Sequence, residues 1–342
     1  MNFRLLTLFL LIFSHSFLPA VDSALEKQRE AENFVAHYFP NAPKEKISIQ
    51  ILSGGYSDAS NFLIVIEGKR FVLRMYPKDE LEKRIQRELY SHQQAAQVGI
   101  APPIYIVGDD GRSVFMEYIE GKTISIDQAK LPENCKKIAE ALRKVHAIAK
   151  NPYPRSSFKE RIEELYNELC SHLKNKETAD AAMQIIRDAD IELQKINTPK
   201  ATIHGDLNPR NIFITQEGVK LIDWSETNWE DPFYDLSCFA LQHDYSNVDE
   251  THLLENYLQH SPTAEEKKHY QLIKKANLAT FSIIGQLFAT KLQSEKNEKI
   301  DPIAPVKEWF YYVNCFANNN TEITAQFFHD WAKISLQRAQ KE

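Results

Sequence analysis

The segment from residue 47 to residue 118 has a pattern of hydrophobic and polar positions that is typical of β-strands. Ile47, Ile49 and Ile51 alternate with polar residues, which is the period of a half-buried strand. Four later runs are rich in β-branched and aromatic residues: Phe62–Ile66, Phe71–Met75, Ile104–Val107 and Ser113–Tyr118. Turn-forming residues lie between successive runs at 67–70 and 109–111, as in β-hairpins. The pattern therefore predicts an antiparallel sheet.

Apolar residues recur with the helical period in segments before, within and after this sheet. The segments Ala24–Phe39 and Asp79–Gln97 show that period in the first 120 residues. Later helical patterns cover Glu133–Lys150, Phe158–Leu173, Thr178–Ile196 and most of the chain from His252 onward. We therefore expect an α+β fold with two lobes. The smaller, β-rich N-lobe would span residues 24–120, and the larger, helical C-lobe would span residues 121–342.

The first twenty residues carry a different pattern, with Arg4 followed by the apolar run Leu5–Phe13 and then by small and polar residues. This order is typical of a secretory signal peptide. The run is shorter than the roughly 20 residues of a membrane span, although a membrane anchor is the rival interpretation. A start site placed too far upstream or a buried helix would also account for the pattern. The protein would be exported or membrane-anchored if residues 1–20 act as a signal, and cytoplasmic otherwise.

Composition excludes several classes of protein. Hydrophobic residues make up 43% of the chain, which is enough to build a core and excludes a fully disordered protein. The net charge of −6 lacks the basic excess of a nucleic-acid-binding protein. The four cysteines include no Cys-x-x-Cys pair, so the sequence carries no zinc or redox signature of that kind.

Residues that could take part in catalysis or metal binding concentrate between His204 and Asp223. The segment reads His204-Gly205-Asp206-Leu207-Asn208-Pro209-Arg210-Asn211, and Asp223 follows two short strand-like runs, Ile212–Thr215 and Val219–Ile222. A hairpin of these two runs would bring Asn211 and Asp223 to the same end. Phosphoryl transfer depends on positioning and on charge neutralisation. Asp206 fits the carboxylate that faces an acceptor hydroxyl, and Asn211 with Asp223 fits the oxygen ligands of Mg²⁺. Each residue alone would read as a turn or surface residue, whereas the combination favours catalysis.

With these motifs the chain resembles the aminoglycoside phosphotransferase and choline/ethanolamine kinase family, whose fold is similar to that of protein kinases. The likeness covers roughly residues 47–290 and is strongest at His204–Asp223. The reading His204-Gly205-Asp206 and Asp223-Trp224-Ser225 matches the small-molecule kinases better than the His-Arg-Asp and Asp-Phe-Gly of protein kinases. Asp231-Pro232 and Asp235-Leu236 resemble a further family segment. The resemblance implies ATP as co-substrate, Mg²⁺ as cofactor and a small alcohol as acceptor.

Candidate nucleotide-binding residues lie in the expected N-lobe. Gly54, Gly55 and Ser57 form a turn-rich loop in which backbone amides could approach phosphates without a Cβ clash. Arg74 closes a strand where a cation would neutralise the α- and β-phosphates, and family members have Lys or Arg at this place. Glu88 would pair with Arg74 and hold it, with Glu82 as a competitor. Glu117 and Ile119 resemble the hinge whose backbone binds adenine.

Candidate acceptor-binding residues follow the Mg²⁺ aspartate. Carboxylates and aromatic rings would suit the cationic head of choline or ethanolamine, the first acceptors that we expect. The candidates in this segment are Glu226, Trp229, Asp231, Tyr234 and Asp235. Aromatic residues further along are Trp309, Tyr311, Tyr312 and Trp331. Ser225 stands where the family has Glu, and Glu226 comes one residue later.

Other functions stay open at this point. Aminoglycosides, thiamine and sugars are further candidate acceptors. A secreted protein-directed kinase would have a longer activation segment than Asp223–Leu236, with Ala-Pro-Glu near its end. A regulatory member of the fold that only binds its ligand would have other residues in place of Asp206, Asn211 or Asp223, and this sequence keeps all three. The sequence leaves the oligomeric state open.

Overall fold

A computed structural model describes residues 21–52, 59–153, 155–173, 175–196, 198–296, 298–301, 304–318 and 324–342. Met1–Ala20 and the loop with Gly54, Gly55 and Ser57 lie outside the described residues. The chain divides into two compact units. The first unit comprises the residues up to Gly121 together with Lys220–Ser225, and the second unit comprises Lys122–Val219 and Glu226–Glu342. The segment Lys220–Ser225 therefore belongs to the first unit, although residues of the second unit flank it in sequence.

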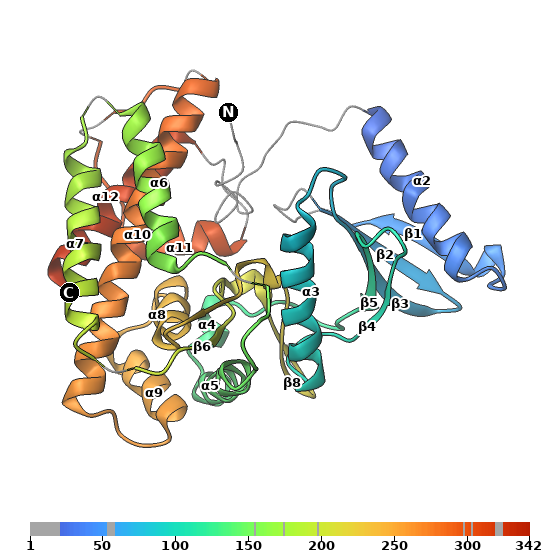
Figure 1. The fold of residues 1–342 in the computed structure, drawn as a ribbon, viewed down its shortest axis with the longest axis horizontal. Coiled ribbons are helices and arrows are strands. Elements are labelled where there is room, and N and C mark those ends of the chain that lie inside the picture. Colours follow the sequence, from blue (N-terminus) through green and yellow to red (C-terminus); the bar gives the residue numbers. More distant parts are fainter. Residues whose placement is uncertain are drawn as a thin grey trace. The chain divides into compact units, whose positions relative to one another are not determined.

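The first unit is built on a five-stranded antiparallel sheet with the strand order β1-β2-β3-β5-β4 (Figure 1). Its strands are β1 (Ile47–Ile51), β2 (Ser60–Ile66), β3 (Lys69–Met75), β4 (Ile104–Val107) and β5 (Ser113–Glu117). All five strands were expected, the first from its alternation and the others from runs of β-branched and aromatic residues, with bounds that differ by two residues at most. Every neighbouring pair in the sheet is antiparallel, including β3 and β5, which are separated in sequence by α3 and β4.

Helices α2 (Val21–Tyr38) and α3 (Glu82–Gln97) cover opposite faces of this sheet. One face buries Phe62, Ile64 and Leu73 against Phe34 of α2. The other face packs Val114 and Met116 against α3, where the main buried apolar residue is Ile85. Side chains alternate between the two faces along each strand, so each helix meets one alternating set. The sheet is buried on both sides, which gives its central strands a fixed register.

A two-residue turn sets the register of β2 against β3. Glu67 and Gly68 both have a positive φ, of 50° and 81°, which is the backbone of the tight hairpin turn that matches the twist of two strands. This turn pairs Ile66 with Lys69 and, further along the hairpin, Asn61 with Arg74. Arg74 therefore lies on a central strand, on the same face as Val72, towards α3.

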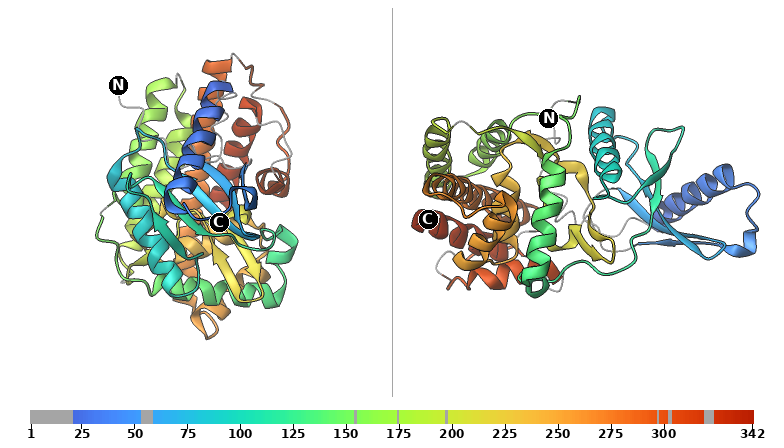
Figure 2. Two further views of the ribbon diagram at one scale, coloured as in Figure 1. Left: turned by 90° about the vertical axis from the view of Figure 1, so that its right-hand side faces the viewer. Right: turned by 90° about the horizontal axis from the view of Figure 1, so that it is seen from below.

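The second unit is mainly helical (Figure 2). Its longer helices are α5 (Pro132–His146), α6 (Phe158–His172), α7 (Glu177–Leu193), α8 (Phe233–Gln242), α9 (Asn247–Leu258), α10 (Ala264–Lys296), α11 (Trp309–Asn318) and α12 (Ala325–Lys341), with a short α4 (Ile126–Ala129). Helix α10 packs against α6, α7, α8 and α12 and forms the centre of this unit. None of the helices among the described residues is both long and apolar enough to cross a membrane.

Short strands flank the loop that contains Asp206 and Asn211. Strand β6 (Ala201–Ile203) pairs with β9 (Asn228–Glu230), and β7 (Ile212–Thr215) forms a two-stranded sheet with β8 (Gly218–Leu221). Strand β9 was not expected, because three residues between loop segments are too few for a visible alternation. The expected helix at Glu133–Lys150 ends earlier, at His146, with Ala147 as its C-terminal cap.

Candidate functional site

Arg74 of β3 forms an ion pair with Glu88 of α3 in the first unit. Nη2 of Arg74 lies 3.2 Å from Oε1 of Glu88 and 3.9 Å from Oδ1 of Asp223, which belongs to the same unit. The Arg74 guanidinium also lies 5.1 Å from the centre of the Tyr76 ring. The predicted competitor Glu82 is exposed and accepts a hydrogen bond from Gln86, so Glu88 is the partner. The structure thus places Asp223 beside the Arg74–Glu88 pair that the sequence predicts.

Burial strengthens the attraction between Arg74 and the carboxylates near it. The side chains of Arg74 and Glu88 are 13% and 6% exposed. Burial alone would lower the pKa of Arg74, but the negative charges of Glu88 and Asp223 and the neighbouring Tyr76 outweigh it and raise that pKa. Burial raises the pKa of Glu88, and the nearby Arg74 opposes this shift. Arg74 is therefore a permanent cation, as a group that neutralises phosphate charge must be.

Asp223 has a backbone conformation that is uncommon outside glycine. Its φ is +63°, in the left-handed region where Asp and Asn are the most frequent non-glycine residues. Trp224, the next residue, is fully buried, and its indole Nε1 donates a hydrogen bond of 3.3 Å to the carbonyl of Leu221. This turn, η3 (Trp224–Glu226), fixes the backbone on the C-terminal side of Asp223.

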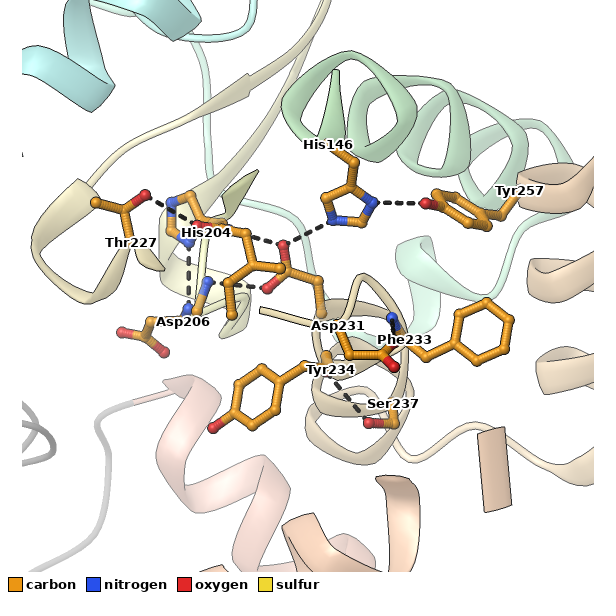
Figure 3. A network of polar contacts seen from close by, with 12 residues as sticks. His146, His204, Asp206, Thr227, Asp231, Phe233, Tyr234, Ser237 and Tyr257 are labelled. Carbon is orange, nitrogen blue, oxygen red and sulfur yellow. Dashed lines mark hydrogen bonds and ion pairs between the residues drawn. The ribbon is translucent and has the colours of Figure 1, made fainter. Parts of the chain in front are cut away.

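Asp206 lies on the loop that follows β6 in the second unit, within a dense hydrogen-bond network (Figure 3). The side-chain amide of Asn208 donates to both oxygens of the Asp206 carboxylate, at 3.0 Å each. The side-chain amide of Asn211 donates to Oδ2 of Asp206 at 3.1 Å and to its backbone carbonyl at 3.0 Å. Two amides therefore orient the half-buried carboxylate, and the Asn211 bonds use its nitrogen, so its side-chain oxygen can serve as a ligand.

The turn η2 (Pro209–Asn211) gives Asn211 its place on this loop. Asn208 caps the turn, because its side-chain oxygen accepts a hydrogen bond of 3.0 Å from the backbone amide of Arg210. Pro209 occupies the first position, where its fixed φ suits a helical turn and its missing N–H costs nothing. The sequence Asn208-Pro209 is thus a local device that sets the spacing between Asp206 and Asn211.

Asp235 of α8 fixes the loop from its buried side. Its carboxylate is fully buried and accepts hydrogen bonds from the backbone amides of His204 at 2.8 Å and Gly205 at 2.9 Å. Oδ2 of Asp235 also lies 3.1 Å from Nε2 of His146. On the other side of the His146 ring, Nδ1 lies 2.8 Å from the hydroxyl of Tyr257 (Figure 3). A chain of polar contacts therefore runs from α9 through α5 and α8 to the loop of Asp206.

Gly205 is required by two features of this loop. Its φ of +84° is in the region that favours glycine. A Cβ atom at this position would lie only 2.5 Å from the carbonyl oxygen of Glu226. The backbone of Glu226 therefore packs directly against the residue before Asp206.

Four of the residues expected to bind the acceptor already have partners within the second unit. Glu226 pairs with Arg155 and Arg161, at 2.8 and 3.2 Å. Oδ2 of Asp231 lies 2.6 Å from Nε2 of His269. Asp235 bonds the loop of Asp206, as described above. The ring of Trp229 has the ammonium group of Lys150 6.0 Å from its centre. Their predicted contact with an acceptor stays a prediction.

The two hinge candidates lie at the end of β5. Glu117 is the last residue of this strand, and its backbone amide donates to the carbonyl of Pro103 at 3.0 Å. Tyr105 donates to its carboxylate at 3.4 Å. Ile119 follows two residues beyond the strand. The positions fit a segment that leaves the sheet, and their role in adenine binding stays a prediction.

Asn211 and Asp223, the two predicted Mg²⁺ ligands, each offer oxygen atoms as donors. Among the residues that the structure describes, no group of three or more His, Cys, Asp or Glu residues is placed to hold a metal ion. One carboxylate and one amide oxygen suit Mg²⁺, which usually keeps waters and takes further oxygens from phosphates. The donor set therefore fits Mg²⁺ better than zinc, which prefers His and Cys.

Solved structures of similar fold include kinases and phosphotransferases. A choline/ethanolamine kinase family protein from Mesorhizobium loti is similar with a TM-score of 0.60 and 18% identity, over 89% of this chain and 99% of the other. Choline kinase from Streptococcus pneumoniae gives 0.62 and 16%, over 92% and 99%. The ADP-bound aminoglycoside phosphotransferase APH(2'')-Ib gives 0.56 and 16%, over 87% and 98%. Identities this low show a shared kinase-like fold alone.

Sequence comparison settles the family. A comparison with curated protein sequences gives no match. A sequence model described as the phosphotransferase enzyme family matches residues 48–268, which is more than half of the chain. The match includes the Arg74–Glu88 pair, the loop of Asp206 and Asn211, and Asp223. The chain belongs to the phosphotransferase enzyme family.

Proposed function

We propose that this protein is an ATP-dependent kinase that transfers the γ-phosphoryl group to a hydroxyl of a small molecule. The observation that carries the proposal is the arrangement around Asp206. Its carboxylate is oriented by Asn208 and Asn211, on a loop whose backbone is bonded to Asp235. An aspartate held in this way can orient a hydroxyl and accept its proton during attack on phosphorus. Membership of the phosphotransferase family supports the same conclusion.

We propose three side chains that would neutralise the charge of the phosphates. We propose that the side-chain oxygen of Asn211 and the carboxylate of Asp223 hold Mg²⁺. When bound, the ion offsets the negative charge that phosphoryl transfer concentrates on the phosphate oxygens. Arg74, fixed by Glu88, adds a permanent cation for the phosphates. We assign Gly54, Gly55 and Ser57 to phosphate contact, and Glu117 and Ile119 to adenine contact, from their places in the sequence.

The proposal extends to which small molecule accepts the phosphoryl group. The structural neighbours include kinases of choline, ethanolamine and aminoglycosides. Choline and ethanolamine are therefore the first acceptors to test, followed by aminoglycosides, thiamine and sugars. Each offers a hydroxyl that an aspartate could orient.

The test is acceptor-stimulated ADP release from Mg·ATP, with the native protein and an Asp206→Asn variant. The variant keeps the shape of the side chain but removes the proton acceptor, so we expect turnover to fall by roughly a hundredfold or more while nucleotide binding stays close to native. Asp127→Asn, an exposed position on α4, is the matched control. Equal turnover in the Asp206→Asn variant and the control would refute the role of Asp206.

A further inference from the structure

The four carboxylates between residues 226 and 235 are all engaged by cations or amides of the protein itself. Glu230 of β9 accepts from the backbone amide of Phe158 at 2.7 Å and from Lys200 at 3.2 Å. Asp231 accepts from the backbone amide of Phe233 at 2.9 Å besides its contact with His269. Glu226 and Asp235 are nearly or fully buried with the partners given above. A cationic head group arriving at this segment would find each carboxylate already paired.

Two cationic side chains contact Glu226. Both arginines approach the same oxygen, Oε2, so two guanidinium groups share one carboxylate. The side chains of Arg155 and Arg161 are only 12% and 10% exposed. Among the described residues, Nε of Arg161 has no hydrogen-bond partner although it is buried. Buried charges and donors without partners are unfavourable, so such a group favours an additional anion.

This arginine pair lies beside the loop of Asp206. The backbone of Glu226 contacts Gly205, the residue directly before Asp206. Residues at the start of α6 are also joined to β9, because Asn228 donates to the carbonyl of Ser156 at 3.1 Å. Strand β9 in turn pairs with β6, with Ile203 opposite Asn228, and β6 leads into the loop. Two contacts, one of Glu226 with Gly205 and one of β9 with β6, therefore connect the segment around the arginines to the loop of Asp206.

We infer that the acceptor is a hydroxylated anion, such as a hydroxy acid or a sugar acid, whose negative group binds Arg155 and Arg161 while its hydroxyl faces Asp206. The inference rests on the proposed kinase function and names its substrate class. A guanidinium pair binds a carboxylate or phosphate through charge-assisted hydrogen bonds. The same pair repels ammonium groups, so choline, ethanolamine and aminoglycosides are disfavoured. The lysine over the Trp229 ring acts in the same direction.

The experiment compares acceptors of similar size that carry a cationic, a neutral or an anionic group besides a hydroxyl. The full chain with Mg·ATP is assayed for ADP release with two series: ethanolamine, ethylene glycol and glycolate, and glucosamine, glucose and glucuronate. We expect the anionic member of one series at least to exceed its cationic counterpart about tenfold or more in kcat/KM, the size of one lost charge-assisted contact. A higher kcat/KM for the cationic members would overturn the inference and leave the kinase proposal standing.

Variants separate a binding role of the arginines from a structural one. Arg161→Gln should raise KM for the anionic acceptor about tenfold and leave KM for ATP unchanged, and Arg161→Lys should restore part of the loss. Glu226→Gln removes the competing carboxylate and should lower the same KM. Arg187→Gln, on α7 beside the Tyr166 ring, is the control. An unchanged anion preference in all variants refutes the inference. ADP release that no acceptor of either series stimulates refutes the kinase proposal and this inference together.

Discussion

The carboxylate of Asp235 accepts a hydrogen bond of 2.9 Å from the backbone amide of Gly205, 30 residues earlier in the chain. Its second oxygen accepts from the amide of His204 and contacts His146. A side chain on α8 therefore sets the backbone of the loop that carries Asp206. The proposed chemistry depends on this buried anion as much as on the aspartate that would touch the substrate.

Asp235→Asn should reduce turnover without abolishing nucleotide binding. The amide group of asparagine would place a donor against donors that the carboxylate now satisfies, at a cost of about 1–3 kcal/mol in the free energy of unfolding. A shift of the loop by about 1 Å would lower kcat by up to roughly a hundredfold. Steady-state kinetics and urea unfolding measure the two effects. Asp188→Asn, exposed on α7, should change neither, and equal behaviour of both variants would contradict the bracing role.

Gly205→Ala should lower the free energy of unfolding by more than the positive φ of this residue alone would explain. The new methyl group would lie 2.5 Å from the carbonyl oxygen of Glu226, so the backbone must move. Gly111→Ala is the control, because Gly111 also has a positive φ, of 65°, but open space around its Cβ position. We expect a loss of several kcal/mol in unfolding free energy for Gly205→Ala and about 1 kcal/mol for the control. Similar melting temperatures would show that the close contact is easily relieved.

Glu88→Gln should weaken ATP binding through Arg74. Without its buried counter-charge, the Arg74 guanidinium keeps the more distant Asp223 as an anionic partner and loses its fixed orientation. We expect KM for ATP to rise about tenfold, with a smaller change in KM for the acceptor. Glu82→Gln alters an exposed residue of the same helix and serves as the control. If nucleotide titrations give one affinity for both variants, Arg74 does not depend on Glu88.

Two buried histidines should make the protein sensitive to mild acid. Burial lowers the pKa of His92 and of His243 to about 4, with nearby Arg74 adding to the shift for His92. Below about pH 6.5 the unfolded chain binds protons that the folded protein does not bind until about pH 4. The free energy of unfolding should therefore fall as pH falls through this window, by up to about 1.4 kcal/mol per pH unit for each histidine.

Urea unfolding between pH 4.5 and 7.5 measures this slope. His243→Gln keeps a neutral donor for the carbonyl of Phe239, which Nδ1 of His243 contacts at 2.8 Å, and should flatten the dependence. His260→Gln, at an exposed position, should leave it unchanged. A slope that is the same in all three proteins would mean that other groups control the acid sensitivity.

Local patterns in the sequence identify the sheet of the first unit and the residues proposed for catalysis and phosphate binding. Alternation and runs of β-branched and aromatic residues mark the strands, and the spacing of Asp206, Asn211 and Asp223 follows from short connections between β6, β7 and β8. The pairing of Arg74 with Glu88 rather than Glu82 required a correct helical phase on α3. These features depend on neighbours in sequence, and for that reason they are visible in one sequence.

Long-range partners were not predictable in this way. Tyr257 contacts His146 across 111 residues, and Asp235 contacts His146 across 89, so no spacing rule connects them. Asp235 was expected to meet the acceptor because it follows the Mg²⁺ aspartate at a short distance. Its burial beneath the loop of Asp206 depends on how α8 packs, which a single sequence does not reveal. The arginines around Glu226 were missed for the same reason.

The placement of Lys220–Ser225 in the first unit has a consequence for synthesis of the protein. The backbone amide of Leu221 donates a hydrogen bond of 2.6 Å to the carbonyl of Ile100, and Asp223 contributes to the cluster of Arg74. A ribosome must therefore translate about 100 residues of the second unit before the first unit has all its parts. A fragment ending at Gly121 would lack them, so the first unit would be incomplete as an isolated piece. Folding of the first unit is completed late, although its sequence emerges first.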